Sequence, residues 1–190
     1  MYNSSEHLER LITALPRETQ ESFIELGERI TLDKHTFLLR EGELCKDLYI
    51  IEKGLFRTFR TIIKNDLPVE ITSGFSFPGD FDTSPSSLIL KMPSRENIQA
   101  ITDSVVIRFD FHKLETLQNS NTKFNELMYF ALMDYTTAIE GILFDFRVLT
   151  ARERYEKLLH LHPEYVQQIP LKYLASFLNM KEETLSRVRR

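Results

Sequence analysis

The sequence predicts an α+β protein with an N-terminal β-sandwich or barrel followed by a helical C-terminal region. Three observations predict this order. Short segments rich in β-branched and aromatic residues recur about every ten residues across 30–111 and are broken by glycine turns. Apolar residues then recur at a helical period over 112–149. Finally, two short apolar-patterned stretches flank Asn179.

Composition limits the class of protein. The 190 residues are 42% hydrophobic and 27% charged, which is ordinary for a soluble globular chain of one or two domains. The single cysteine, Cys45, excludes an intrachain disulfide and a four-cysteine metal site. No basic segment followed by an apolar stretch opens the chain, and the longest apolar run, 127–133, is shorter than the about 20 residues that span a bilayer. We therefore expect a cytoplasmic protein that makes no membrane contact.

The first element expected is a helix over 5–27, interrupted near Pro16. Its apolar positions fall at helical spacing; they are Leu8, Leu11, Ile12, Leu15, Phe23, Leu26 and Ile30. The β region follows, and it contains one further short helix. Ser84 stands at an N-cap position with Pro85 at the first helical position, and the segment 91–93 ends the helix.

A long helix of more than 30 residues, roughly 50 Å at 1.5 Å per residue, is expected after His112. It carries an apolar stripe with alternating spacings of four and three, which is a heptad seam. The stripe consists of Met128, Leu132, Tyr135, Ile139, Ile142, Phe146 and Leu149. We expect two chains to pair along it. The alternative is that the stripe packs on its own β domain.

Two further helical units complete the chain. Thr150 followed by Glu153 predicts a capping box, with a helix running to about His162. In the last segment, Asn179 supplies the left-handed residue between two helices, as in a helix-turn-helix. The inward positions of this pair are Leu171, Leu174, Ala175, Leu178, Leu185 and Val188. The alternative is an ordinary helical hairpin with an exposed charged face.

Charge is unevenly distributed along the chain. Residues 148–190 carry eight Lys or Arg against five Asp or Glu, a net charge of +3, whereas residues 1–147 carry −7. An acidic body with a basic tail suggests that only the tail meets a polyanion. The alternative is a chance imbalance, because +3 over this length is modest.

Two stretches of the sequence resemble a known family. They are "REGELCKDLYIIEKGLFR", residues 40–57, and "LASFLNMKEETLSRVRR", residues 174–190. Both are similar to segments of the Crp/Fnr family of bacterial transcription regulators. The resemblance implies a cyclic-nucleotide-binding-like jelly-roll β-barrel in 1–111, a dimerisation helix in 112–149 and a winged-helix-like helix-turn-helix in 150–190.

The resemblance also implies a DNA-reading face. Glu183, Thr184 and Arg187 match a family pattern whose glutamate and arginine face base edges, where they can bind cytosine and guanine. The DNA-facing residues are expected to be Lys172, Glu182, Glu183, Thr184, Ser186, Arg187, Arg189 and Arg190. The chain departs from the pattern in three ways. Glu182 stands where many members have arginine, the wing segment 163–170 is short, and the sequence stops at the recognition helix.

The effector cassette departs further from the family pattern. Thr83 and Ser84 stand where members that bind cyclic AMP have Gly-Glu, Ser94 falls at the arginine position, and Arg95 comes one residue late. One residue along an extended segment reverses the side chain's direction. The serines at the start of the short helix could hold a small anion or only cap it. Candidate ligand residues are Gly79, Asp80, Phe81, Thr83, Ser84, Ser86, Ser87, Ser94 and Arg95. We expect no cyclic AMP binding and assign no cofactor.

These observations favour a homodimeric DNA-binding transcription regulator. Its expected partners are double-stranded DNA, a second copy of the chain and RNA polymerase. The alternative is a ligand-binding or protein-interaction module whose terminal hairpin does not read DNA. No catalytic constellation is evident, so an enzyme is not expected. The pair His160 and His162 would not share a helix face, so no metal site is expected either.

Overall fold

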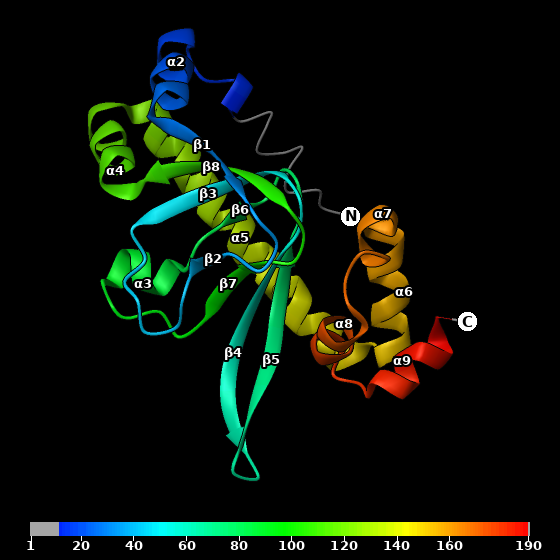
Figure 1. Cartoon of the computed structure of the whole chain (residues 1–190). Coiled ribbons are helices and arrows are strands. Elements are labelled where there is room, and N and C mark those ends of the chain that lie inside the picture. Colours follow the sequence, from blue (N-terminus) through cyan, green and yellow to red (C-terminus); the bar gives the residue numbers. More distant parts are fainter. Residues whose placement is uncertain (1–11, 190) are drawn as a thin grey trace.

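The computed structural model describes residues 12–189 of the chain. Within this range, two four-stranded antiparallel sheets face each other in a jelly-roll arrangement (Figure 1). One sheet has the strand order β1-β8-β3-β6 and the other β2-β7-β4-β5. The strands are β1 (Gly27–Leu32), β2 (Phe37–Leu39), β3 (Asp47–Lys53), β4 (Phe56–Lys64), β5 (Leu67–Ser76), β6 (Phe81–Asp82), β7 (Asn97–Ala100) and β8 (Ser104–Asp110).

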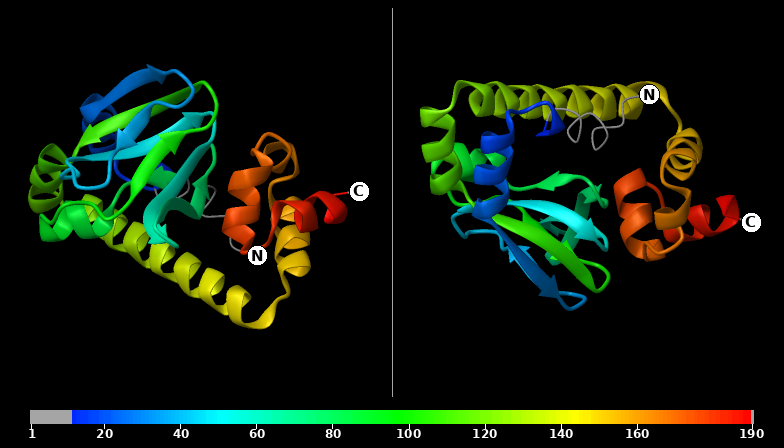
Figure 2. Two further views of the ribbon diagram at one scale, coloured as in Figure 1. Left: turned by 60° about the horizontal axis from the view of Figure 1, so that its bottom comes forward. Right: turned by 90° about the horizontal axis from the view of Figure 1, so that it is seen from above.

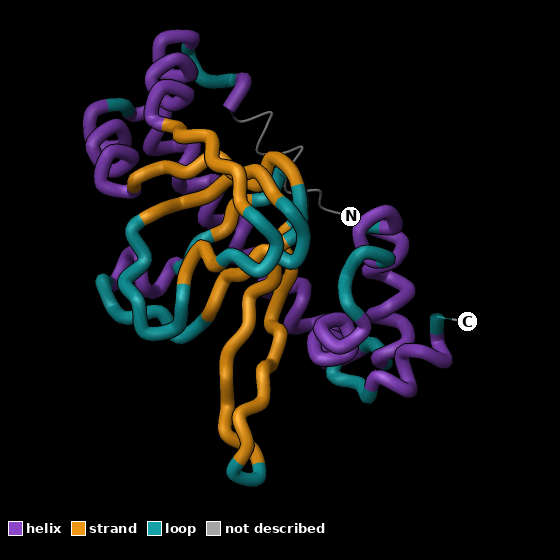
Figure 3. The backbone as a smooth tube through the Cα atoms, in the orientation of Figure 1, coloured by secondary structure: helices purple, strands orange, loops and turns teal. Residues whose placement is uncertain are grey.

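The helices lie at the two ends and along one side of this β-roll (Figure 3). They are α2 (Arg17–Leu26), α3 (Pro85–Leu90), α4 (Phe111–Ser120), α5 (Thr122–Val148), α6 (Ala151–Leu161), α7 (Pro163–Val166), α8 (Leu171–Leu178) and α9 (Glu182–Val188). The predicted fold of β-roll, long helix and C-terminal helix-turn-helix is therefore confirmed.

Apolar side chains from both sheets fill the β-roll. Ile51, Phe56, Ile98 and Val106 are almost completely buried and belong to one cluster. Burying each such side chain contributes about 1.5–3 kcal/mol. The β4–β5 hairpin extends beyond this core and turns at Asn65 and Asp66, which have the positive φ angles of a tight hairpin turn (Figure 1).

The N-terminal helix is described from Ile12 onward. Pro16 precedes α2, and Phe23 of α2 stacks on Phe109 of β8 with ring centroids 4.6 Å apart. The predicted break near proline is thus present. Leu8 and Leu11 lie outside the described residues, as do the remaining residues of 1–11.

The predicted continuous helix after His112 was wrong, because the chain breaks at Asn121. This residue has an extended conformation, with φ −135° and ψ 108°, and its side chain caps α5 by accepting a hydrogen bond from the backbone N–H of Phe124. Its amide also donates to the hydroxyl of Thr19 in α2. Helix α5 therefore has 27 residues, about 40 Å at 1.5 Å per residue.

Helix α5 is unusually apolar for an exposed helix. Over 18 residues its mean hydropathy reaches 1.2, so by length and composition it could cross a membrane. Polar residues interrupt its apolar positions, so the unbroken run at 127–133 is much shorter than the helix. Only 6% of that window is buried within the chain. Its first turns, however, pack into the protein, since Phe124 and Leu127 join the cluster around Phe23 and Phe109. The remainder of α5 exposes many large apolar side chains to solvent.

The C-terminal unit matches the sequence expectations at its caps. The hydroxyl of Thr150 accepts from the N–H of Glu153, whose carboxylate accepts from the N–H of Thr150, which confirms the capping box. Asn179 is left-handed with φ 55° and ψ 50°, as predicted. The expected wing over 163–170 is not formed: that segment is the short helix α7 and a turn, and no strand occurs in 150–189.

This unit packs against one end of the β-roll (Figure 2). Leu55, Phe77 and Ile101 of the roll share an apolar cluster with the core of the helices. The helical members are Tyr155, Val166, Ile169, Leu174, Ala175, Leu178 and Leu185. The proposed boundaries at 111 and 149 remain a prediction, since this cluster spans the roll and the C-terminal unit.

Candidate effector cavity and nucleic-acid interface

A cavity of about 1020 Å³ lies between the β-roll and α5. The roll contributes the end of β5, β6 and α3, and α5 runs along the opposite side (Figure 2). Apolar side chains form much of its lining; they include Phe75, Leu88, Ile89, Leu132, Ile139 and Ile142. A mostly apolar cavity with a few polar groups is the usual form of a small-molecule site.

The predicted heptad stripe of α5 faces this cavity. Leu132, Tyr135, Ile139 and Ile142 line it, and each is still more than a third exposed. At the end of the helix, Phe146 instead contacts Arg154 and Phe177 of the C-terminal unit. The stripe therefore faces its own β domain, which was the alternative weighed for it. Pairing of two chains along it stays a prediction.

Phe146 fixes the end of α5 to the C-terminal unit. The guanidinium of Arg154 lies 4.4 Å from the centre of its ring, and Phe177 of α8 meets it edge-on at 6.1 Å. Arg154 also donates to the carbonyls of Leu149 and Leu178. One side chain thus satisfies carbonyls at the ends of both α5 and α8.

Two carboxylates on β6 and the turn before it lie at the cavity. The N–H of Phe77 donates to Oδ2 of Asp80 over 2.8 Å, and the hydroxyl of Ser76 donates to Oδ2 of Asp82 over 2.7 Å. Burial raises the pKa of Asp80 to about 6. Burial also raises the pKa of Asp82 to about 7, and the negative charges of Asp80 and Glu96 add to this shift. Both groups therefore titrate near neutral pH.

The other charges around the cavity are also mainly negative. Glu96, Glu115 and Asp134 line it, and Arg60 is the one basic side chain among the described lining residues. Arg60 lies 3.7 Å from a carboxylate oxygen of Glu96, so its charge is compensated locally. Burial raises the pKa of Tyr135 as well, with further contributions from Glu96 and Asp82.

The predicted ligand residues separate into two groups. Asp80, Phe81 and Thr83 line the cavity. The others do not; they are Gly79, Ser84, Ser86, Ser87, Ser94 and Arg95. Ser84 occupies the N-cap position of α3, but its side chain makes no capping hydrogen bond, contrary to expectation.

The buried serines of this group bond to the protein instead. The hydroxyl of Ser87 accepts from the N–H of Cys45, and that of Ser94 donates to the carbonyl of Glu96 over 2.8 Å. Arg95 is exposed. The serines and the arginine thus form no shared anion site at the cavity. The acids that do gather there, Asp82 and Glu96, were missed, although the alternation of Asp80 and Asp82 along a strand was a usable signal.

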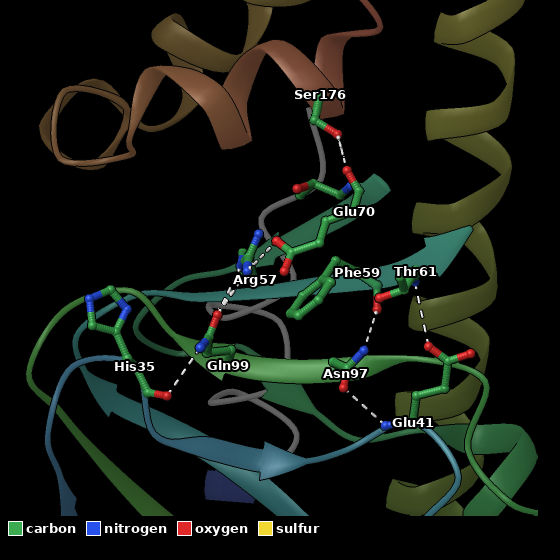
Figure 4. Close-up of polar contacts among 10 residues, drawn as sticks. His35, Glu41, Arg57, Phe59, Thr61, Glu70, Asn97, Gln99 and Ser176 are labelled. Atoms are coloured by element: carbon green, nitrogen blue, oxygen red, sulfur yellow. Dashed lines mark hydrogen bonds and ion pairs between the residues drawn. The ribbon is translucent and has the colours of Figure 1, made fainter. Parts of the chain in front are cut away.

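A second polar site joins the β4–β5 hairpin to α8 (Figure 4). Arg57 is 3% exposed, donates twice to Oε1 of Gln99 and forms an ion pair with Glu70 at 2.8 Å. Its guanidinium lies between the rings of Phe59 and Tyr173, 3.9 and 3.7 Å from their centres. Its Nη1 has no hydrogen-bond partner among the described residues.

Backbone and hydroxyl groups strengthen the same contact. Ser176 of α8 accepts a hydrogen bond from the N–H of Thr72 over 3.0 Å. Its hydroxyl also lies 3.4 Å from the carbonyl of Glu70 (Figure 4). Phe75 meets Phe177 edge-on with ring centroids 5.3 Å apart. We call this set of contacts, from Arg57, Glu70, Thr72 and Phe75 to α8, the hairpin joint.

The outer face of α9 is exposed, as the sequence predicted. Glu182, Glu183 and Arg187 are exposed, whereas Leu185 is completely buried. Nε of Arg187 lies 3.4 Å from the carbonyl of Glu183, one turn earlier. Thr184 and Ser186 are half-buried.

The basic residues expected to flank this face differ in their surroundings. Lys172 is exposed in the first turn of α8. Arg189 instead donates to the carbonyl of Val166, so its side chain is engaged with α7. Arg190 lies outside the described residues. The structure therefore brings Glu183 and Arg187 together and holds Arg189 on the adjoining helix.

Comparison with known proteins finds a domain family by sequence and several whole-chain neighbours by shape. Residues 29–121 match the family model described as "Cyclic nucleotide-binding domain". Among solved structures, FixK2 from Bradyrhizobium japonicum is 17% identical with a TM-score of 0.70, covering 86% of this chain and 82% of that one. The catabolite activator protein of Thermus thermophilus is 18% identical with a TM-score of 0.58, covering 94% and 84%.

A third structure, from Eubacterium rectale and described as a regulator of the Crp/Fnr family, is 19% identical with a TM-score of 0.60 and covers 94% and 83%. The chain has the Crp/Fnr fold. No curated protein sequence matches it. In this Crp/Fnr fold the cavity lies between the matched nucleotide-binding domain and α5, and the exposed face of α9 lies in the C-terminal unit.

Proposed function

We propose that the chain is a cytoplasmic, homodimeric, DNA-binding transcription regulator of the Crp/Fnr type, whose β-roll cavity does not take cyclic AMP. The observation that carries the proposal is the outward pair Glu183 and Arg187 on the second helix of a helix-turn-helix, within a chain of Crp/Fnr fold. RNA polymerase is the partner that such a regulator would address.

Base reading is assigned to α9. Arg187 can pair bidentately with guanine in the major groove, and Glu183 can accept from the amino group of cytosine. Lys172 and Arg190 are assigned to phosphates, which supply affinity without sequence preference. Arg189 would have to leave the carbonyl of Val166 to reach a phosphate.

A protein that reads two half-sites one helical turn apart must be a dimer, and we assign the dimer contact to α5. Since the predicted stripe of α5 faces the cavity, the contact is assigned to a second apolar set on the same helix. It recurs every three or four residues on the outer side and consists of Phe130, Met133, Thr137, Gly141, Phe144 and Val148. Phe144 is 63% exposed, and open space surrounds Gly141. We propose that a second chain, rather than lipid, covers this set.

The cavity lacks the partner that a cyclic nucleotide phosphate requires. Arg95 is exposed and outside the lining, and Ser94 at the expected arginine position is buried and bonded to the chain itself. Arg60 is paired with Glu96. A phosphate placed here would face several carboxylates, with no unpaired Lys or Arg among the described lining residues, which is unfavourable.

The proposal can be tested by selecting fragments bound by the purified chain from genomic DNA at low salt. A shared, two-fold symmetric sequence with half-sites one helical turn apart is expected. Replacing Arg187 with alanine should weaken binding to that sequence by about 1–3 kcal/mol and relax the preference at one base pair. Lys64→Ala, at the exposed tip of the hairpin, is the control for loss of one positive charge.

Equal, sequence-independent losses from both substitutions would remove the base-reading role of Arg187. The second candidate function, a protein-interaction module, is favoured by the two exposed glutamates in the first turn of α9, which repel phosphates. Absence of any salt-dependent DNA binding by the intact dimer would support that candidate instead.

A further inference from the structure

We propose that the cavity between the β-roll and α5 binds an organic cation with an apolar body, such as a primary amine on an aromatic or branched aliphatic skeleton. This deepens the proposed function, on which it rests, by naming the chemical class of the effector. It also departs from what the matched domain family's description suggests, since a cyclic nucleotide is an anion.

The size and lining of the cavity set the body of the ligand. At about 1020 Å³, the cavity is at the upper end of the range for small-molecule sites, roughly 300–1000 Å³. Phe75 from β5 and Leu132, Ile139 and Ile142 from α5 give it apolar walls on both sides. Burying an apolar skeleton there contributes about 25 cal/mol per Å² of surface removed from water.

The charges of the cavity set the head of the ligand. Asp82 is 6% exposed and Asp80 is half-buried, and both line the cavity. Asp82 accepts hydrogen bonds from the hydroxyl of Ser76 and from the backbone of Thr83, and Asp80 accepts one from the N–H of Phe77. Neither forms an ion pair with a described Lys or Arg. The neighbouring Arg60 is already opposite Glu96. A ligand cation would supply the missing positive charge.

An aromatic side chain completes the recognition site for a cation. Tyr135 of α5 lines the cavity and lies close enough to Asp82 and Glu96 for their charges to act on it. A tyrosine ring attracts an ammonium group by its electron-rich face, and adjacent carboxylates add Coulombic attraction. The two sides of the cavity thus offer complementary parts of one site.

The spacing of the acids favours an organic cation over a bare metal ion. In the part of the chain that the structure describes, no three His, Cys, Asp or Glu side chains gather closely enough to hold a metal. A divalent ion such as Ca²⁺ requires six or more oxygen ligands at about 2.3–2.6 Å. An ammonium group needs only two or three acceptors at hydrogen-bond distance.

Three probes with the same body test the charge preference directly: phenylbutylamine, phenylbutanol and phenylbutanoate, positive, neutral and negative at pH 8. Calorimetric titration of the full chain should give a dissociation constant for the amine at least tenfold lower than for the alcohol. The acid should bind more weakly than the alcohol. Cyclic AMP, as a fourth probe, should bind no better than the acid.

Substitution then assigns the preference to the cavity. Asp82→Asn should raise the dissociation constant of the amine about tenfold and leave that of the alcohol unchanged. Glu96→Gln is a second variant, in case the first does not fold, and should act in the same direction. Asp66→Asn, at the exposed hairpin tip, removes one negative charge from the surface and should change nothing.

The proposal is overturned if the acid or cyclic AMP binds as tightly as the amine. It also fails if no amine binding is detected, or if Asp66→Asn weakens it as much as Asp82→Asn does. DNA retention measured on the same preparation separates the two hypotheses. Salt-dependent DNA binding without amine binding overturns the cation site alone, and amine binding without DNA binding overturns the regulator.

Discussion

The two halves of β5 border sites that differ in how their buried charges are paired. Its first half, with Glu70 and Thr72, contacts α8 in the hairpin joint, where the buried cation Arg57 has a carboxylate, an amide and two aromatic faces around it. Its second half, with Ser76, borders the cavity, where the carboxylates of Asp80 and Asp82 form no ion pair with any Lys or Arg that the structure describes. The buried charge of the joint is thus paired within the chain, whereas the carboxylates at the cavity are the groups to which we assign a ligand cation.

The largest effect is expected when the joint loses its cation. Arg57→Ala leaves Glu70 and Gln99 without their partner and separates the rings of Phe59 and Tyr173, so the free energy of unfolding should fall by about 3–5 kcal/mol. Urea unfolding followed by circular dichroism measures this. Arg17→Ala is the control, since its ion pair with Glu21 is exposed and should contribute less than about 1 kcal/mol. A similar small loss for Arg57→Ala would contradict the difference between the two halves of β5.

At the cavity, removing a buried charge should raise the free energy of unfolding rather than lower it. The pKa of Asp82 is raised from 3.8 to about 7, so the folded state holds a proton that the unfolded state releases earlier. The free energy of unfolding contributed by this group is therefore lost as pH rises from about 4 to about 7. Asp82→Asn should be more stable than the parent at pH 8, by on the order of 4 kcal/mol, and similar to it at pH 4.

Thermal unfolding of both proteins across this pH range measures the effect. Asp80, whose pKa is raised to about 6, should leave a smaller slope of the same sign in the variant. Asp66→Asn should retain the full slope of the parent. A parent protein whose stability rises from pH 4 to pH 8 would show that the cavity carboxylates are solvated or already paired.

The smallest effect concerns the pH dependence of cation binding. A bound ammonium favours the ionised form of Asp82, so proton release accompanies binding below pH 7. With a pKa of about 7 in the free protein, phenylbutylamine should bind about tenfold more tightly at pH 8 than at pH 6. The groups around Asp82 are Asp80, Glu96, Tyr135 and Arg60, of which Asp80 would add to this change.

Titration calorimetry at both pH values measures this change. The alcohol probe should show no such dependence, and Asp82→Asn should remove most of it for the amine. Equal affinity of the amine at both pH values in the parent protein would place its charge away from the two carboxylates.

The sequence predicted the fold well because the relevant signals are local. The capping box at Thr150 and Glu153 and the left-handed Asn179 each depend on a few neighbouring residues, and both were confirmed. The continuous helix after His112 failed for the same local reason. The apolar period continues across Asn121, but the side chain of this residue caps α5 and so interrupts the helix. Asn121 also makes a tertiary hydrogen bond to Thr19.

The candidate site could be predicted only in part, because it depends on distant segments meeting. Asp80 and Thr83 were expected at the cavity from the family pattern, but Tyr135 and Glu96 become its neighbours only when α5 lies along the roll. The hairpin joint brings together residues more than a hundred positions apart, such as Thr72 and Ser176. No period or spacing within either segment predicts such a pairing.

Phe77 contacts both a cavity residue and the C-terminal unit. Its N–H binds the carboxylate of Asp80 at the cavity, and its ring stacks on His162, between α6 and α7, with centroids 4.0 Å apart. A ligand that moves Asp80 would therefore also act on the contact between Phe77 and His162. Such coupling is reciprocal: if an effector changes the affinity for DNA by some factor, DNA changes the affinity for the effector by the same factor. In the regulator proposed above, the affinity measured for the effector would therefore depend on whether DNA is bound.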